Sequence, residues 1–230
     1  MAIQKNTQFV GRIENLIYYK SMDRYCIRTV PKQMRQSEAT KQAARNFGLI
    51  YSRSKILRSL AGNLIADPRD RAMQARLRKA LSEALKLNPA STTDALVQPL
   101  LGFAFNEALP LGECLRFPIE MTGQPGEKIR IEIPAINPMQ SITAPPDASR
   151  VQLEFIALSF SFEHERTVRS APQILNIPLT DSIQPPLSLE LEALTEKPCI
   201  LLVVLAVSYW NEDRRIMQGE YNPVEVTGVF

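Results

Sequence analysis

The sequence predicts an α+β protein in which a basic β-hairpin and basic helices precede an antiparallel, immunoglobulin-like β-sandwich. The apolar residues repeat with a helical period between residues 37 and 101 and with a strand-like period after residue 103. Most of the 17 prolines lie beyond residue 98, where they separate short apolar segments, as is typical of an all-β domain. The predicted domains are therefore a basic hairpin and helical module over residues 1–98 and an acidic β-sandwich over residues 99–230.

Residues 9–31 are predicted to form the hairpin. Its strands are residues 9–20 and 25–30, which are rich in aromatic and branched side chains, and residues 21–24 supply the turn. Pro31 ends the second strand because proline has no N–H to donate. An isolated two-stranded hairpin is only marginally stable in water, so we expect it to pack on the rest of the chain or on a neighbouring copy.

A first helix is predicted over residues 37–65, with Ser37 as its N-cap. Leu49 and Ile56 fall outside the centre of its apolar face, so the helix has more apolar surface than a simple surface helix requires. We interpret this excess as a partner surface. The residues of the apolar face recur at spacings of three and four: Ala43, Phe47, Ile50, Leu57, Ala61 and Leu64.

A second helix is predicted to begin at Asp67, which can cap it, with Pro68 in the first helical position. Residues 94–101 are predicted to form one further short helix. The buried stripe of the second helix consists of Met73, Leu77, Ala80, Leu81 and Ala84.

The second half of the chain is predicted to contain seven or eight short strands in two packed antiparallel sheets. Residues 199–207 are apolar at both odd and even positions, as expected for a central strand with both faces buried. The candidate strands are residues 115–121, 128–133, 151–162, 174–177, 187–194, 199–209, 215–220 and 224–229.

Charge divides the chain into two opposite parts. Residues 1–90 hold 18 Lys and Arg against 6 Asp and Glu, a formal +12, and residues 91–230 hold 9 against 18, a formal −9; together they give the net charge of +3. The electrostatic field of two oppositely charged parts affects association and choice of partner rather than fold. This charge distribution favours one of two kinds of binding. Either the basic part of one copy contacts the acidic part of another copy, or the basic part binds a polyanion.

Partner-binding residues are predicted on the hairpin and the two helices. Lysine and arginine can neutralise phosphates or carboxylates, and tyrosines can stack on bases or on a neighbouring copy. The competing interpretation is a solvated polar face on an ordinary pair of helices. The candidate residues are Tyr18, Tyr19, Tyr25, Arg45, Lys55, Arg71, Arg78 and Lys79.

No set of residues predicts catalysis, a cofactor or a metal. The three cysteines, at positions 26, 114 and 199, are far apart and do not form a metal-binding or disulfide pattern. His164 is the single histidine, and its neighbours Glu163 and Glu165 would point to the opposite side of a strand. Glycine-rich phosphate loops and nucleophile elbows are absent. We therefore expect a protein that is not an enzyme and has no cofactor.

The N-terminus has no basic segment followed by an apolar run, as a secretory signal would. The longest apolar stretch, residues 199–207, is far shorter than the ~20 residues that span a bilayer. These observations predict a cytoplasmic protein without membrane insertion.

Residues 11–19 and 25–31 contain two short patterns that are also found in other proteins. Gly11 and Asn15 form a Gly-x-x-x-Asn pattern, and Arg28 and Pro31 form an Arg-x-x-Pro pattern before the first helix. In these features the chain is similar to uncharacterised proteins of Bacteroidota with an N-terminal hairpin, basic helices and a C-terminal β-rich domain. Glu14 stands where such hairpins more usually have glycine. The resemblance implies the same fold and gives no activity to transfer.

The function expected from the sequence is structural. Opposite charges, a marginal hairpin and extra apolar residues on the first helix together predict a subunit of a homo-oligomeric assembly, such as a filament, tube or phage-like particle. A nucleic-acid-binding protein using the basic helices is the alternative. A β-sandwich that binds a small molecule or glycan through its loops is the second alternative.

Overall fold

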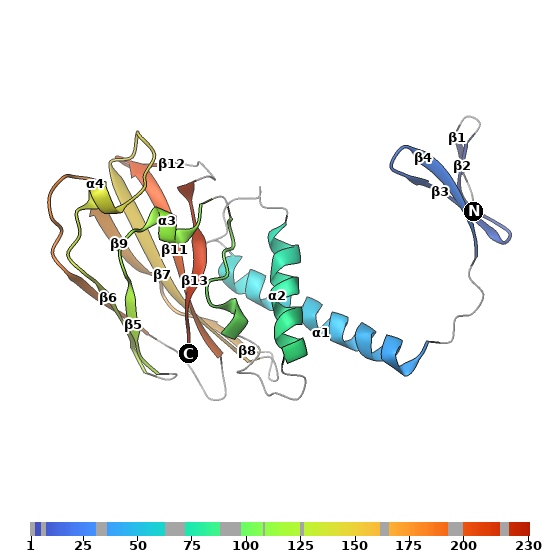
Figure 1. The fold of residues 1–230 in the computed structure, drawn as a ribbon, viewed down its shortest axis with the longest axis horizontal. Helices are drawn as coiled ribbons and strands as arrows, with labels where there is room; N and C mark the ends of the chain where they lie inside the picture. Colours follow the sequence, from blue (N-terminus) through green and yellow to red (C-terminus); the bar gives the residue numbers. More distant parts are fainter. Residues whose placement is uncertain are drawn as a thin grey trace. The chain divides into compact units, whose positions relative to one another are not determined.

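The structure is a computed structural model, and it describes residues 3–5, 8–30, 36–62, 72–87, 98–107, 109–124, 127–161, 166–192, 200–216 and 221–230. It confirms a mixed helix-and-strand protein. All strand pairings among the described residues are antiparallel. The chain divides into two compact units, Met1–Asn46 and Phe47–Phe230 (Figure 1).

The first unit contains a four-stranded sheet rather than the predicted two-stranded hairpin. Its strands β1 (Ile3–Lys5), β2 (Gln8–Ile13), β3 (Leu16–Ser21) and β4 (Arg24–Thr29) pair in chain order. The single strand predicted over residues 9–20 is wrong because the chain turns back at Glu14, whose φ of 48° lies in the left-handed region. The predicted turn between β3 and β4 is confirmed.

Helix α1 (Glu38–Ala61) begins where the sequence predicts. The backbone N–H of Thr40 donates to the Ser37 hydroxyl at 3.2 Å, so Ser37 is the N-cap. Ile50 and Leu57 are buried as expected, but Phe47 is 61 % exposed. The predicted apolar face is therefore wrong in the first half of the helix, because the core that covers α1 begins at Ile50.

Helix α2 (Met73–Leu87) buries the predicted stripe of Met73, Leu77 and Leu81. The proposed start at Asp67 and Pro68 lies outside the described residues. Of the short helix predicted over residues 94–101, the described part is a single 3-10 turn, η3 (Gln98–Leu100).

A six-stranded, curled sheet forms the centre of the second unit. The long strands β7 (Arg150–Ser161) and β11 (Ile200–Asn211) pair along almost their whole length. Strands β8 (Arg166–Arg169) and β9 (Gln173–Pro178) pair with β7. Strands β12 (Arg214–Ile216) and β13 (Val224–Val229) pair with β11.

A second, three-stranded sheet has the order β10-β6-β5, with β5 (Glu120–Thr122), β6 (Ile129–Ile133) and β10 (Leu187–Leu191). Two single-turn helices, α3 (Leu111–Cys114) and α4 (Pro138–Ser141), lie in the connections around it. The strand predicted over residues 115–121 is wrong, because only its last two residues belong to β5. Strand β8 was not expected from the sequence.

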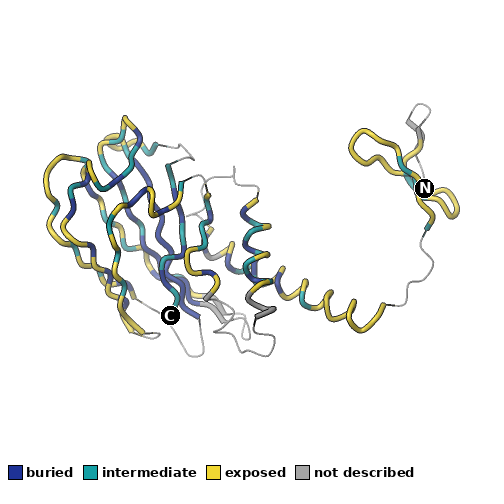
Figure 2. The backbone as a smooth tube through the Cα atoms, in the orientation of Figure 1, coloured by how far each residue is buried: buried dark blue, intermediate teal, exposed yellow. Residues whose placement is uncertain are grey.

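The six-stranded sheet has a hydrophobic core on each face. On one face, Ile156 and Leu202 share a cluster with Leu57 of α1 and Leu77 of α2. On the other face, alternate residues of β7 and β11 share a second cluster with β6, β10 and α3. Figure 2 shows the dark blue, buried strands between these layers.

The division into units differs from the boundary that the sequence predicts between residues 98 and 99. Helix α2 and the second half of α1 belong to the same unit as the C-terminal sheets. The reason is that their buried side chains cover one face of the six-stranded sheet.

Candidate interaction surfaces

The N-terminal sheet has one apolar and one basic face. Cross-strand partners share a face, and the register pairs Gly11 with Tyr18 and Tyr18 with Ile27. Because side chains alternate along each strand, this register assigns every residue of β2–β4 to a face. The apolar face consists of Phe9, Ile13, Leu16, Tyr18, Tyr25 and Ile27. The basic face carries Arg12, Arg24 and Arg28 together with Val10, Ile17, Tyr19 and Cys26.

Neither face of this sheet is covered. Among the described residues 9–30, none is buried, and Figure 2 shows these strands as exposed or intermediate. On the apolar face the rings of Phe9 and Tyr18 are tilted together with centroids 5.9 Å apart. On the basic face the Arg28 guanidinium lies 5.6 Å from the Tyr19 ring centroid. The sheet thus presents aromatic and cationic groups without a core beneath them.

The structure distributes the three predicted tyrosines over both faces of the sheet. Tyr18 and Tyr25 lie on the apolar face, whereas Tyr19 lies on the basic face. Tyr19 and Tyr25 are about 40 % exposed, at 39 % and 42 %. Tyr18 and Tyr19 are neighbours in one strand and point in opposite directions, so the three rings do not share one face of the sheet.

The structure describes four of the five predicted cations on the helices. Arg45 and Lys55 are exposed residues of α1, ten positions apart in the sequence. Arg78 of α2 lies over the Tyr51 ring at 5.9 Å and donates to the Gln74 carbonyl, which gives it contacts within its own unit. Lys79 is exposed, with its Nζ 4.0 Å from a Glu83 carboxylate oxygen. Arg71 lies outside the described residues.

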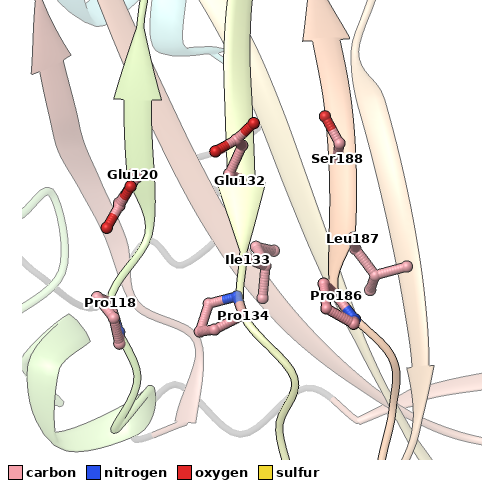
Figure 3. Close-up of a pocket in the computed structure, with 8 residues that line it drawn as sticks. All are labelled: Pro118, Glu120, Glu132, Ile133, Pro134, Pro186, Leu187 and Ser188. Carbon is pink, nitrogen blue, oxygen red and sulfur yellow. The ribbon is translucent and has the colours of Figure 1, made fainter.

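An acidic groove lies on the outer face of the three-stranded sheet. Glu120 of β5 stands directly opposite Glu132 of β6, and Ser188 of β10 follows in the same row (Figure 3). The groove encloses about 360 Å³. Its lining residues are Pro118, Glu120, Glu132, Ile133, Pro134, Pro186, Leu187 and Ser188.

The two glutamates of the acidic groove repel each other. Like charges directly opposite each other on adjacent strands are destabilising, and neither Glu120 nor Glu132 forms an ion pair with another described residue. Farther along the same face, Lys128 Nζ lies 2.8 Å from Glu190 Oε2. This contact raises the pKa of Lys128 and lowers the pKa of Glu190. Two carboxylates thus stand side by side in the groove.

The acidic groove was not predicted from the sequence. The alternation of Ile129, Ile131 and Ile133 with Arg130 and Glu132 indicates a strand with one polar face. That pattern places Glu132 in solvent, but the pairing that brings Glu120 beside it joins residues twelve positions apart, across the connection between β5 and β6. The glycines and proline of residues 123–126 indicate a turn between two strands, but they do not specify the register that places the two glutamates opposite each other.

Cys114 is buried in a polar network within the second unit. Its Sγ lies 2.9 Å from the Tyr209 hydroxyl, which donates to the carbonyl of Thr143 at 2.6 Å. Burial raises the pKa of Cys114 to about 11, so the group is a neutral thiol at physiological pH. A neutral, buried thiol is a poor nucleophile, and we assign this network to structure.

Within the described ranges no three His, Cys, Asp or Glu residues lie close enough together to hold a metal ion. His164 with its two glutamates lies outside those ranges. None of the described helices has the length and apolar character needed to cross a membrane.

Comparison of the chain with known protein families, with curated proteins and with solved structures gave no match.

Proposed function

We propose that this chain is a non-enzymatic subunit of a homo-oligomeric assembly, such as a filament, tube or phage-like particle. The basic face of one copy's N-terminal sheet contacts the acidic groove of the next copy. One observation carries the proposal: the N-terminal sheet has no buried residue among those described, although half of its side chains are large and apolar or aromatic.

A sheet without a core requires something to pack against. Three or more strands are stable in water when a hydrophobic face is covered, and unpaired strand edges recruit further strands. Strand β4 is an edge of the N-terminal sheet. In an assembly, a neighbouring copy supplies the missing cover.

The charges favour a contact between unlike surfaces. Arg24 and Arg28 lie on one face of the N-terminal sheet, and guanidinium groups pair well with carboxylates. In the acidic groove such a contact would relieve the repulsion between the two glutamates. A contact between two different surfaces continues from copy to copy unless its rotation closes a ring, so it can build extended assemblies.

The test is the mass of the purified, nuclease-treated protein at low and high salt, measured by size-exclusion chromatography with light scattering. We expect large species at low salt that shrink as salt rises, because exposed charge contacts are screened over about 8–10 Å at 0.1–0.15 M. Deleting residues 1–31 should leave a folded protein that no longer assembles. A monodisperse monomer under all conditions would contradict the proposal.

Charge exchange tests the specific contact. Arg24→Glu with Arg28→Glu should weaken assembly, and adding Glu120→Lys with Glu132→Lys should restore it. The matched control is Glu113→Gln with Glu212→Gln, two exposed glutamates outside the three-stranded sheet, which should leave assembly unchanged. If the fourfold variant assembles no better than the double arginine variant, the two surfaces do not meet.

Nucleic acid binding is the second candidate, favoured by the exposed Arg28 and Tyr19 pair, which could contact a phosphate and a base. The same chromatography separates the two functions. Large species that disappear on nuclease treatment would support nucleic acid binding and contradict direct contacts between copies.

The finer fold assignment is also a proposal. We interpret the six-stranded and three-stranded sheets as an immunoglobulin-like sandwich, supported by one hydrophobic cluster that draws buried residues from both sheets. The cytoplasmic location stays a prediction.

A further inference from the structure

We propose that residues 102–107 form a strap that closes the outer edge of strand β13, and that Arg76 of α2 holds this strap in place. When the strap opens, the free edge of β13 binds the strap of a second copy. This device does not depend on the basic-to-acidic contact proposed above.

The strap is bound to β13 by backbone hydrogen bonds. The N–H of Phe105 donates to the Val224 carbonyl at 2.7 Å, and the N–H of Gly102 donates to the Val226 carbonyl at 2.8 Å. In return, the N–H of Val226 donates to the Phe103 carbonyl at 3.1 Å. The opposite edge of β13 pairs with β11, so the strap covers an edge that would otherwise be open to another strand.

Arg76 holds the strap through contacts that do not involve β13. Its Nη1 donates to the Ala104 carbonyl at 2.7 Å, and its Nε lies 3.1 Å from Glu107 Oε2. Its guanidinium carbon is 5.5 Å from the centroid of the Phe103 ring. The Arg76 side chain is 21 % exposed, so these contacts are partly shielded from water. One arginine of α2 therefore contacts the strap at three places.

The strap can open without unfolding the sheet that it joins. Its pairing with β13 is an isolated bridge, between Ala104 and Glu225, whereas β7 and β11 form a long ladder. Opening the strap breaks a few hydrogen bonds and the Arg76 contacts, and it leaves the ladders of the six-stranded sheet intact. Such a step is a local opening that requires less free energy than global unfolding.

The strap itself shows which strand fits the free edge. Strand addition takes its affinity from backbone bonds and its specificity from alternate side chains. Phe105 is 3 % exposed and belongs to the same hydrophobic cluster as Val224 and Val226. The Phe103 ring packs edge-on against Phe105 with centroids 5.2 Å apart. A second copy carries the same segment, and the exchange of an identical segment reproduces these contacts between copies.

Hydrogen exchange of the full-length wild-type protein tests the opening without substitutions. At low urea, the amides of Gly102, Phe105 and Val226 should exchange by a local opening that urea barely affects. The amides of β7 and β11 should exchange by global unfolding, which urea accelerates. If both sets of amides respond to urea in the same way, the strap opens only with the whole unit and the proposal is overturned.

Substitution of Arg76 tests its role. Arg76→Ala should speed exchange of the three strap amides about tenfold, because a hydrogen bond to a charged group contributes roughly that factor to an equilibrium. Lys79→Ala is the matched control, because it removes an exposed cation of α2 whose ion partner is Glu83, and it should leave these rates unchanged. Equal rates in the two variants would overturn the role of Arg76. If Arg76→Ala does not fold, Glu107→Gln replaces it, with a smaller expected increase.

A labelled peptide with the sequence of residues 100–107 tests what the open edge binds. Fluorescence anisotropy is measured in 1 M NaCl, where screening over ~3 Å removes the basic-to-acidic contact. The Arg76→Ala protein should bind the peptide about tenfold more tightly than the wild type, because the wild-type strap competes for the edge. The same peptide with Phe105→Asp should not bind. Equal binding of the two peptides, or no binding to the Arg76→Ala protein, would overturn the exchange between copies.

Discussion

The N-terminal sheet and the six-stranded sheet are both antiparallel, yet one has no core and the other has two. In β11, alternate side chains enter the two hydrophobic clusters, so that residues 200–209 are all buried. In β2–β4 the same alternation separates apolar from basic side chains, and none of the described ones is buried. The difference indicates that the larger sheet contributes stability, and it motivates our proposal that the N-terminal sheet contributes association.

This contrast also separates the two halves of α1. Ile50, Leu57 and Ala61 pack against the six-stranded sheet, whereas the described residues from Glu38 to Leu49 are exposed or intermediate. A helix gains most of its stability in proteins from packing of its apolar face. The second half of α1 is therefore held by the second unit, and the first half is part of the uncovered region.

The largest expected effect is the loss of the helical layer. A fragment of residues 47–230 should fold with a cooperative thermal melt, and a fragment of residues 99–230 should not. The shorter fragment loses five large buried side chains, each contributing roughly 1.5–3 kcal/mol, which together approach the stability of a whole domain. Circular dichroism measures both melts. A cooperative melt of the shorter fragment at the same temperature would show that the helices add little.

A matched pair of phenylalanines should give the next largest effect. Phe155→Ala should lower the free energy of unfolding by about 3–5 kcal/mol, because Phe155 is fully buried between the two sheets of the second unit. Phe9→Ala should change it by less than about 0.5 kcal/mol, because Phe9 is 40 % exposed. Urea denaturation of both variants measures the difference. Similar losses for the two would mean that the N-terminal sheet belongs to the same core.

The smallest effect concerns two cysteines and leaves the fold unchanged. In a Cys199→Ser protein at pH 8, iodoacetamide should modify Cys26 at least ten times faster than Cys114. With a pKa of about 11, roughly one Cys114 in a thousand is a thiolate at that pH, and the residue is fully buried. Cys26 is partly exposed. Peptide mapping by mass spectrometry gives both rates, and equal rates in the native protein would contradict the comparison.

Several parts of the structure could be predicted from short stretches of sequence. The apolar run at residues 200–207 lies in the central strand, and the alternation at residues 129–133 forms a strand with one buried face. Ser37 caps its helix as its side chain predicts. In each case the signal is a period or a side chain acting on its own neighbours, which is information that the sequence holds locally.

Other parts depended on contacts that no local pattern contains. The chain turns back at Glu14, although residues 9–20 favour one extended strand. The pairing of β2 with β3 stabilises this turn. The exposure of Phe47 follows from where the sheet beneath α1 ends. The acidic groove exists because β5 pairs with β6 in one particular register.

The sequence by itself therefore determined the mixed fold class, most of the C-terminal strands and the division of charge into a basic and an acidic part. The tertiary structure decided which faces are covered and which carboxylates meet. The physical reason is that propensity and period act between residues close in the chain. Burial and strand register instead depend on the summed packing of segments far apart in the sequence.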